Sequence, residues 1–379
     1  MCRAETVKRG NTTEMQNNQA PRWIGGVEPA PELLRATGIE ILELECREQP
    51  ERLRGLLRSY ATDPEIRKQL AEIRKLCAAP GPVLFLGMGA SLCSSYGGSV
   101  PLDAEGRLAF SVDAGEWLHY GTRTWDQAAL SVLLTTSGES AELVELLTVA
   151  EDRPLVLISN NTASPCWRMA RRRLPILAGP EYGNATKTYT NATAAASVVA
   201  AEILGQDWRR DAEAAADAFS SSLERIFARR SELESFCRGA ANTEIIGRGA
   251  AYGGAMMSAL CIREMSGHRA AAHTGAAFRH GPNLDVDATH AAIILALGRR
   301  ADLGVKLAAE CALKGGKVVL VSDQEREATA SILPVRLDPV AEHWEGLTSI
   351  ITAQALTLAM IERNGCRLPP RFQYGVMEQ

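Results

Sequence analysis

The stretch Val83-Leu84-Phe85-Leu86-Gly87-Met88-Gly89-Ala90-Ser91 decides the fold class, because a short apolar run passes directly into a glycine-rich turn. Consecutive apolar residues bounded by a turn predict a buried strand. The runs 130–134 and 154–158 repeat this pattern, and each ends in Ser, Thr or Asn residues. Helical segments, including 141–150, lie between the runs. This alternation predicts a parallel sheet covered by helices on both faces.

The same pattern returns in the second half of the chain, where residues 244–246 run into Gly247-Arg248-Gly249-Ala250. The runs 291–297 and 317–321 predict further buried strands, and 302–314 predicts a helix between them. We therefore expect an α/β protein with two tandem units, each a three-layer, flavodoxin-like sandwich around a parallel sheet. The units repeat the architecture without close sequence identity.

The helical lead-in shows apolar residues at helical spacing in two stretches, 41–44 and 53–57, and a further helix that starts at Asp63-Pro64. Asp is a favoured cap, and Pro is favoured at the first helical position. The expected organisation is a disordered or extended segment 1–28, a helical lead-in 29–78, a first unit 79–205, a helical connector 206–240, a second unit 241–365, and a tail 366–379 over the active site.

Composition excludes two classes of partner. The chain has 379 residues, of which 46% are hydrophobic and 23% charged, and its formal net charge is −4. Nucleic-acid binding favours a basic surface, so we expect no nucleic-acid partner. A membrane span needs about 18 or more consecutive apolar residues, and the sequence contains no such run. We therefore expect no membrane association, and the polar stretch 1–25 predicts no signal peptide.

The cysteines and glycines exclude several kinds of site. Nine cysteines are scattered without a CxxC pair, so we expect no metal site, no disulfide framework and a reducing cytoplasm. Gly87-x-Gly89 and Gly247-x-Gly249 both lack the third glycine of a dinucleotide fingerprint, and no phosphate-binding loop of the nucleotide triphosphatase type is present. We expect no cofactor.

The turn Thr135-Thr136-Ser137-Gly138-Glu139-Ser140 carries four hydroxyls beside a glycine at the expected start of a helix. Hydroxyls and free backbone N–H groups at a helix N-terminus suit a phosphate monoester. The alternative is that these residues only cap the helix. Capping needs one hydroxyl rather than four, so we favour a phosphate site.

Two residues of the second unit are candidates for acid–base chemistry. Glu264 lies four residues after Leu260 on an expected helix, a register expected to place it toward the ligand end of the second unit. His280 lies in the loop Phe278-Arg279-His280-Gly281-Pro282. Taken singly, Glu264 suits a surface ion pair and His280 an ordinary loop side chain. Beside a phosphate site they suit a base and a proton shuttle for carbonyl chemistry.

Together these motifs resemble the sugar isomerase (SIS) domain proteins, in the layout of the isomerase half of glucosamine-6-phosphate synthase. The residues that carry the resemblance are Gly87-Met88-Gly89-Ala90-Ser91, Thr136-Ser137-Gly138-Glu139-Ser140, Gly247-Arg248-Gly249, Ala259-Leu260 with Glu264, and Phe278-Arg279-His280-Gly281-Pro282. Arg47-Glu48-Gln49-Pro50 is similar to a Glu-Gln-Pro element in the lead-in helices of that enzyme. The resemblance covers most of the chain.

The resemblance implies a binding role for two sets of residues. The sugar 6-phosphate would be held by Thr135, Thr136, Ser137 and Ser140. The sugar itself would be contacted by Gly89, Ser91, Glu181 and Thr186. Glu181 looks like the family's Glu before its Thr-Lys pair, although the segment 179–187 is one residue shorter than the synthase form and lacks its usual Ser.

The resemblance also implies the chemistry and the assembly. Glu264 would be the base that moves a proton between C1 and C2 of the sugar. His280 would assist opening of the sugar ring, and in this family it reaches the site from the neighbouring subunit. A homodimer that binds a small-molecule sugar phosphate is therefore expected.

Three departures separate the chain from the synthase. Met1-Cys2 resembles the start of a glutamine amidotransferase, but the first α/β unit begins near Pro82, so we expect no glutaminase activity. The synthase's tail lysine, which forms a Schiff base, has no counterpart, since the last lysine here is Lys317. Cys261 and Ala277 stand where the synthase carries Lys and Glu. Synthesis of glucosamine 6-phosphate from glutamine is therefore not expected.

The stretch 371–378 is more similar to the Arg-Tyr-Tyr-Gly-type ending of fructoselysine-6-phosphate deglycases. The resemblance therefore implies an enzyme acting at C1/C2 of a 6-phosphorylated amino sugar or fructosamine, with a deglycase preferred over a deaminase or an aldose–ketose isomerase. The alternative is a regulator that binds a sugar phosphate without chemistry. No helix-turn-helix precedes the sheet, and a pure binder needs neither Glu264 nor His280, so we favour the enzyme.

Overall fold

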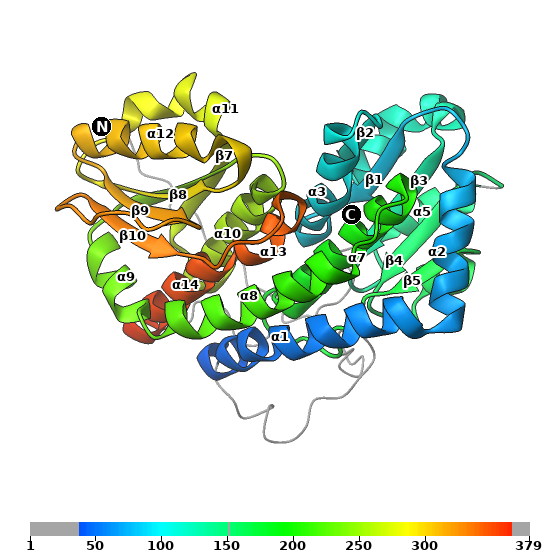
Figure 1. Ribbon diagram of the computed structural model, residues 1–379, viewed down its shortest axis with the longest axis horizontal. Helices are drawn as coiled ribbons and strands as arrows, with labels where there is room; N and C mark the ends of the chain where they lie inside the picture. The colour runs from blue at the N-terminus through cyan, green and yellow to red at the C-terminus, as the bar shows by residue number, and fades with distance from the viewer. Residues whose placement is uncertain (1–37, 151, 366–379) are drawn as a thin grey trace, which may run out of the picture.

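Two five-stranded sheets, with all paired strands parallel, form two α/β units that lie side by side (Figure 1). The computed structural model describes residues 38–150 and 152–365. The expected N-terminal segment 1–28 and tail 366–379 lie outside the described residues. The strand orders are β2-β1-β3-β4-β5 and β10-β9-β8-β6-β7. The expected two parallel α/β sandwiches are confirmed.

The first unit follows the lead-in helices α1 (Gly38–Thr62) and α2 (Pro64–Leu76). Its elements are β1 (Val83–Gly87), α3 (Ala90–Ala104), β2 (Ala109–Asp113), α4 (Ala114–Glu116), η3 (Trp117–Gly121), η4 (Thr122–Gln127), β3 (Leu130–Thr135), α5 (Ala141–Val149), β4 (Leu155–Ser159), α6 (Pro165–Met169), β5 (Arg173–Pro175) and α7 (Lys187–Leu204).

The second unit follows the connecting helices α8 (Arg209–Phe227) and α9 (Arg230–Cys237). Its elements are β6 (Asn242–Gly247), α10 (Ala251–Ser266), β7 (Arg269–Thr274), α11 (Gly275–Arg279), η5 (Pro282–Asp285), β8 (His290–Ala296), η6 (Gly298–Arg300), α12 (Ala301–Leu313), β9 (Lys317–Ser322), β10 (Ile332–Arg336), η7 (Glu342–Trp344), α13 (Glu345–Thr348) and α14 (Ile351–Asn364).

The strands that the apolar runs predicted are the central ones, and the strands that those runs missed are all at sheet edges. The expected strands appear as β1, β3, β4, β6, β8 and β9. The missed strands are β2 and β5 in one sheet and β7 and β10 in the other. Central strands are covered on both faces and need continuous apolar sequence, whereas edge strands tolerate exposed polar residues.

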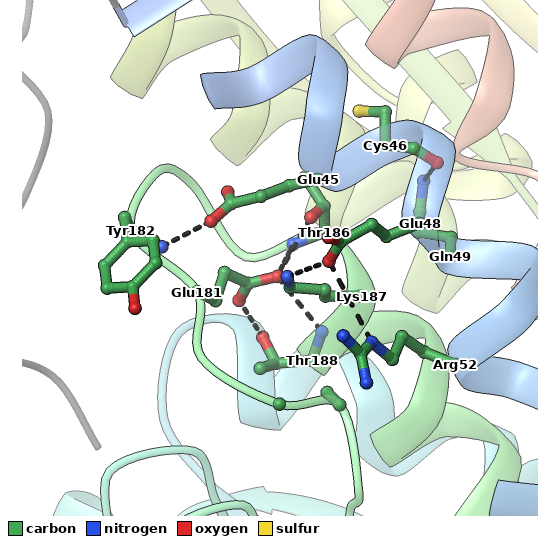
Figure 2. Close-up of polar contacts among 12 residues, drawn as sticks. Glu45, Cys46, Glu48, Gln49, Arg52, Glu181, Tyr182, Thr186, Lys187 and Thr188 are labelled. Carbon is green, nitrogen blue, oxygen red and sulfur yellow. Dashed lines mark hydrogen bonds and ion pairs between the residues drawn. The ribbon is translucent and has the colours of Figure 1, made fainter. Parts of the chain in front are cut away.

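The lead-in differs from the expectation in one respect, because the two stretches 41–44 and 53–57 belong to a single helix, α1. Pro50 lies inside this helix and has no N–H to donate to the carbonyl of Cys46. The Gln49 side chain supplies the missing donor, with Nε2 3.0 Å from the Cys46 oxygen (Figure 2). The helix therefore continues through its proline. The next helix starts as expected, with Asp63 capping α2 and Pro64 in its first turn.

Gln49 also joins the two units through one buried cluster of hydrogen bonds. Its side chain is 0% exposed. Its amide exchanges hydrogen bonds with Gln354 of α14, at 3.1 and 3.2 Å, and accepts one at 2.7 Å from the Thr190 hydroxyl of α7. Both donors and both acceptor sites of the amide are satisfied. Helix α1 is thus fastened at one point to a helix of each unit.

Helix α1 runs beneath both units with α8 beside it (Figure 1). Helices α1, α7 and α14 contribute to one apolar core that also includes central strands of both sheets. No helix in 38–150 or 152–365 is long and apolar enough to cross a membrane.

We predict that Gln49→Ala lowers the free energy of unfolding by about 3 kcal/mol, because it leaves the Gln354 amide and the Cys46 carbonyl with buried, unpaired polar atoms. The measurement is urea unfolding followed by circular dichroism. The control is Gln206→Ala, at an exposed position after α7; it should change stability by less than about 0.5 kcal/mol. Equal effects of the two variants would show that the cluster does not hold the units together.

Candidate functional site

The turn after β1 brings Gly89 and Ser91 to the carboxyl edge of the first sheet. Gly89 is the residue before α3 and has a φ of 54°, in the region that favours glycine. Gly87 is needed for close packing, since a Cβ there would lie 2.8 Å from the Ser91 backbone. Ser91 is partly exposed in the first turn of α3. Its position at the start of the helix suits contact with a ligand, and its role remains a prediction.

The hydroxyl-rich turn lies at the same edge, between β3 and α5. Two of its hydroxyls shape the turn itself: Thr135 Oγ1 accepts from Gly138 N at 3.0 Å, and Ser137 Oγ accepts from Glu139 N at 3.3 Å. Gly138 has a φ of 66°, and a side chain there would clash with Ser164. The turn is therefore rigid and needs glycine at this position.

The other two hydroxyls of the turn, those of Thr136 and Ser140, bear on whether these residues only cap helix α5. Ser140 occupies the cap position of α5, yet its side chain makes no capping hydrogen bond. Among the described residues, the hydroxyls of Ser140 and Thr136 have no hydrogen-bond partner, and both residues are partly exposed. Capping therefore does not explain these hydroxyls. They lie beside the N-terminus of α5, where an anion is favourably bound.

The corresponding turns of the second unit are built differently. Arg248 follows β6, and its guanidinium packs so closely on Gly275 that a side chain at 275 would clash with it. Burial lowers the pKa of Arg248, and the charges of Arg279 and Arg300 lower this pKa further. The turn after β8 carries Gly298, Arg299 and Arg300 in place of hydroxyls. Among the described residues, the hydroxyl turn thus belongs to the first unit.

Glu264 lies in the last turns of α10 and faces the first unit. The expectation that it lies at the ligand end of the second unit is wrong, because α10 starts at the carboxyl edge of that sheet and runs back toward the opposite edge before β7. Its carboxylate accepts a hydrogen bond from Nδ2 of Asn184, which lies in the segment between β5 and α7. The second unit therefore delivers this acid to the first.

Glu264 is also close to α3, the helix that follows the glycine-rich turn. Burial raises the pKa of the Cys93 thiol in α3 to about 12, and the negative charge of Glu264 contributes to this rise. Helices α3 and α10 pack tightly, since a side chain at Gly253 would clash with the Cys93 carbonyl. Cys93 lies two residues after Ser91, so the structure brings Glu264 near the expected sugar-binding turn.

Glu181 holds the segment that carries Asn184 against the start of α7 (Figure 2). Its carboxylate accepts from the backbone N–H and hydroxyl of Thr186, both at 2.9 Å, from Thr188 N at 3.2 Å, and from the Thr188 hydroxyl. These N–H groups belong to the start of α7, so Glu181 caps that helix. The structure places Glu181 and Thr186 in one buried cluster. Their expected contact with the sugar stays a prediction.

Glu45 of α1 holds the same segment from the other side (Figure 2). Its carboxylate accepts from the backbone N–H groups of Tyr182 and Gly183. Burial raises the pKa of Glu45 well above its usual value, and the nearby charge of Glu181 raises it further. The two backbone donors and Lys187 act in the opposite direction. The sequence did not predict this contact, since nothing local links residue 45 to residue 182.

Two basic side chains, Lys187 of α7 and Arg52 of α1, lie on either side of Glu48 of α1. Lys187 is buried and forms an ion pair with Glu48, while Arg52 Nε lies 3.9 Å from the Glu48 carboxylate (Figure 2). Arg52 also lines a pocket of about 410 Å³ at the carboxyl ends of β3, β4 and β5. Thr136 and Glu181 line this pocket too, so it adjoins the hydroxyl turn.

His280 is exposed, at the end of α11 in the second unit. Its imidazole makes no hydrogen bond within the part of the chain that the structure describes, and no contact joins it to Glu264 there. The described chain does not bring the two expected acid–base residues together. The expected role of His280 at the site stays a prediction.

The metal-binding residue types form no site in the described ranges. No group of three or more His, Cys, Asp or Glu side chains there is arranged to hold a metal ion. The arrangement that the structure does show is a hydroxyl turn at the carboxyl edge of the first sheet and, at the junction of the two units, the Glu264 carboxylate hydrogen-bonded to Asn184.

Comparison with known proteins identifies related sequences and related folds. The family model described as "SIS domain" matches residues 239–361. The chain is 23% identical over 278 residues to the isomerizing glutamine–fructose-6-phosphate aminotransferase of Methanothermobacter thermautotrophicus, an alignment that covers 73% of this chain and 46% of that protein. The chain thus spans about half the length of the curated relatives it matches.

Solved structures share the whole architecture. The C-terminal domain of glucosamine-fructose-6-phosphate aminotransferase from Francisella tularensis superposes with a TM-score of 0.79 at 19% identity, over 90% of this chain and 100% of that one. Tagatose-6-phosphate ketose/aldose isomerase from Escherichia coli superposes with a TM-score of 0.73 at 18% identity, over 93% and 99% of the two chains. At these identities the likeness shows the fold.

We predict that the stability of Glu45→Gln relative to the wild type increases as pH rises above about 4.5. The raised pKa of Glu45 means that the folded state binds its proton more tightly than the unfolded state does. The wild type therefore loses stability as pH rises through the folded pKa, whereas the variant, with an uncharged amide in place of this carboxyl, does not. Urea unfolding of both proteins between pH 5 and pH 9 measures the gap; a constant gap would contradict the prediction.

Proposed function

We propose that this chain, whose residues 239–361 form a SIS domain, is an enzyme that moves a proton between C1 and C2 of a 6-phosphorylated amino sugar or fructosamine. One observation carries the proposal: Glu264 of the second unit meets Asn184 of the first, beside the helix that begins with the glycine-rich turn. A carboxylate at that place can act as a general base.

The hydroxyl turn supplies the phosphate site in this proposal. Thr135 and Ser137 hold the turn in shape, while Thr136 and Ser140 present unused hydroxyls beside the N-terminus of α5. Hydroxyl and backbone N–H donors bind a phosphate without any cationic side chain. This arrangement explains how a chain with a net charge of −4 binds an anionic substrate.

For a fructosamine 6-phosphate, the proposed reaction starts at the C1–H bond. Glu264 removes the C1 proton as the C2 carbonyl oxygen is protonated. A proton is then delivered to C2 while the nitrogen gives up its N–H proton, so that the ketoamine becomes an imine at C1 with a hydroxyl at C2. Water adds to the C1=N bond, the C1–N bond breaks, and glucose 6-phosphate and a free amine are formed. The substrate brings its own nitrogen, so no lysine of the enzyme is required. A deaminase or an isomerase would use the same transfer between C1 and C2.

The names of the related proteins support a sugar 6-phosphate as the substrate class. Both the aminotransferases and the E. coli isomerase are described as acting on hexose 6-phosphates. We propose a homodimer in which His280, exposed in the single chain, completes the neighbouring subunit's site and assists ring opening. The seven cysteines that the structure describes are buried free thiols, which suits a reducing cytoplasm.

An assay coupled to glucose-6-phosphate dehydrogenase tests the reaction on fructosamine 6-phosphates, glucosamine 6-phosphate and fructose 6-phosphate. We expect turnover of a fructosamine 6-phosphate, and we expect Glu264→Gln to lower kcat about 10³-fold while substrate still binds, because the amide cannot accept the proton. The control is Glu213→Gln, at an exposed position of α8.

The panel separates the remaining readings. Glucose 6-phosphate from fructose 6-phosphate alone would identify an isomerase, and ammonia from glucosamine 6-phosphate a deaminase. Binding without turnover of any compound would identify a regulator. Full activity of Glu264→Gln would remove Glu264 as the base.

We predict that Ser140→Ala weakens binding of 6-phosphorylated sugars about tenfold, because a hydrogen bond to a charged group is lost. Ser140 makes no capping hydrogen bond, so its removal should change the free energy of unfolding by less than about 0.5 kcal/mol. Calorimetry with glucosamine 6-phosphate and with glucosamine measures the effect. An equal loss for both sugars, or a large loss of stability, would contradict the phosphate site.

A further inference from the structure

Asn184 lies in the segment between β5 and α7 and is only 1% exposed. Its Nδ2 donates to the Glu264 carboxylate. Its Oδ1 is buried and has no hydrogen-bond partner among the described residues. Buried side-chain oxygens are usually paired, so this acceptor needs an explanation.

The hydrogen-bonding capacity of the Glu264 carboxylate determines how the Asn184 amide is oriented. An ionised carboxylate has no proton to donate, so only the amide nitrogen can face Glu264. The amide oxygen must then point to another neighbour. The hydrogen bond from Asn184 therefore fixes where the Glu264 carboxylate lies.

Asn184 is held between two anchored ends of its segment. On one side, Glu45 accepts from the N–H groups of Tyr182 and Gly183. A Cβ at Gly183 would lie 2.9 Å from a Glu45 carboxylate oxygen, so a larger residue there would displace the Glu45 side chain. On the other side, Glu181 holds Thr186 at the start of α7. Asn184 is therefore placed before any substrate arrives, as a preorganised site requires.

We propose that Asn184 is a positioning residue for Glu264, and that its Oδ1 accepts a hydrogen bond from the amine or hydroxyl at C2 of the substrate. The second contact rests on the proposed function, because it assumes that Glu264 is the base at C1 and C2. The segment 179–187 is also where this chain departs from the synthase form. Asn184 thus contributes both the geometry of the base and a preference for a substrate with a hydrogen-bond donor at C2.

The first experiment records the ¹³C signal of the Glu264 side-chain carboxyl in the unliganded protein at one fixed pH, with labelled glutamate and the signal assigned from Glu264→Gln. Asn184→Leu keeps the side-chain volume and removes both polar atoms. We expect it to shift this signal, because the hydrogen bond from Asn184 Nδ2 to the carboxylate is lost. Asn184→Ala serves as a second variant if the Leu variant does not fold.

Asn191 provides a matched control. It is equally buried and its Oδ1 is also unpaired among the described residues, but its Nδ2 donates to the backbone carbonyls of Arg52 and Ile176 rather than to a carboxylate. Asn191→Leu should lower stability without moving the Glu264 carboxyl signal. No shift in the Asn184 variants, or an equal shift in Asn191→Leu, would overturn the positioning role.

The second experiment compares binding of glucosamine 6-phosphate with binding of 2-deoxyglucose 6-phosphate, which has no donor at C2. We expect the wild type to prefer glucosamine 6-phosphate about tenfold, and Asn184→Leu to lose this preference while 2-deoxyglucose 6-phosphate binds unchanged.

The two experiments separate the inference from the proposed function. If the wild type binds neither sugar phosphate, the proposed function and the C2 contact both fail, and the NMR comparison of the Glu264 carboxyl signal still decides whether Asn184 positions Glu264. If the wild type binds both sugars and Asn184→Leu keeps the preference for glucosamine 6-phosphate, the C2 contact is overturned while the proposed function stands.

Discussion

The buried amide of Gln49 is the interaction on which the arrangement of this protein depends. It satisfies the carbonyl that Pro50 leaves unpaired within α1, and it binds Thr190 of the first unit and Gln354 of the second. Each unit has its own sheet, but Glu264 reaches the first unit only because the two units are held in one orientation. A fully satisfied polar cluster specifies such an orientation better than apolar packing alone, since a shifted arrangement would leave its donors and acceptors unpaired.

Helix α1 links this fastening point to the candidate site. Glu45, Glu48, Gln49 and Arg52 are spaced three and four residues apart, so they share one face of the helix. The same face that joins the units therefore also holds the segment that carries Asn184. Burying Glu45 beside Glu181 is unfavourable for the charged form, which its raised pKa reflects. The compensation is a rigid segment, because each carboxylate accepts hydrogen bonds from backbone N–H groups in it.

The sequence predicted the central part of each sheet better than its edges. Strands such as β3 and β8 are covered on both faces and consist of continuous apolar residues, which are visible without a structure. The edge strands β2 and β7 are mostly partly exposed, and their polar and small residues carry no clear period. The site follows the same rule. The hydroxyl turn could be predicted because its residues are consecutive, whereas the partners of Glu264 could not, since Asn184 is 80 positions away.

By itself the sequence determined which residues are available and which local structures they form: two α/β units, a hydroxyl turn after β3 and an acid on α10. These properties depend on neighbours within a few positions, so residue type and spacing suffice to encode them. Only the tertiary structure decided that Ser140 does not cap its helix, that Glu264 faces the first unit, and that Asn184 meets it. Those outcomes depend on how distant segments pack, and packing is set by the fit and hydrogen bonding of the whole core rather than by any one stretch of the chain.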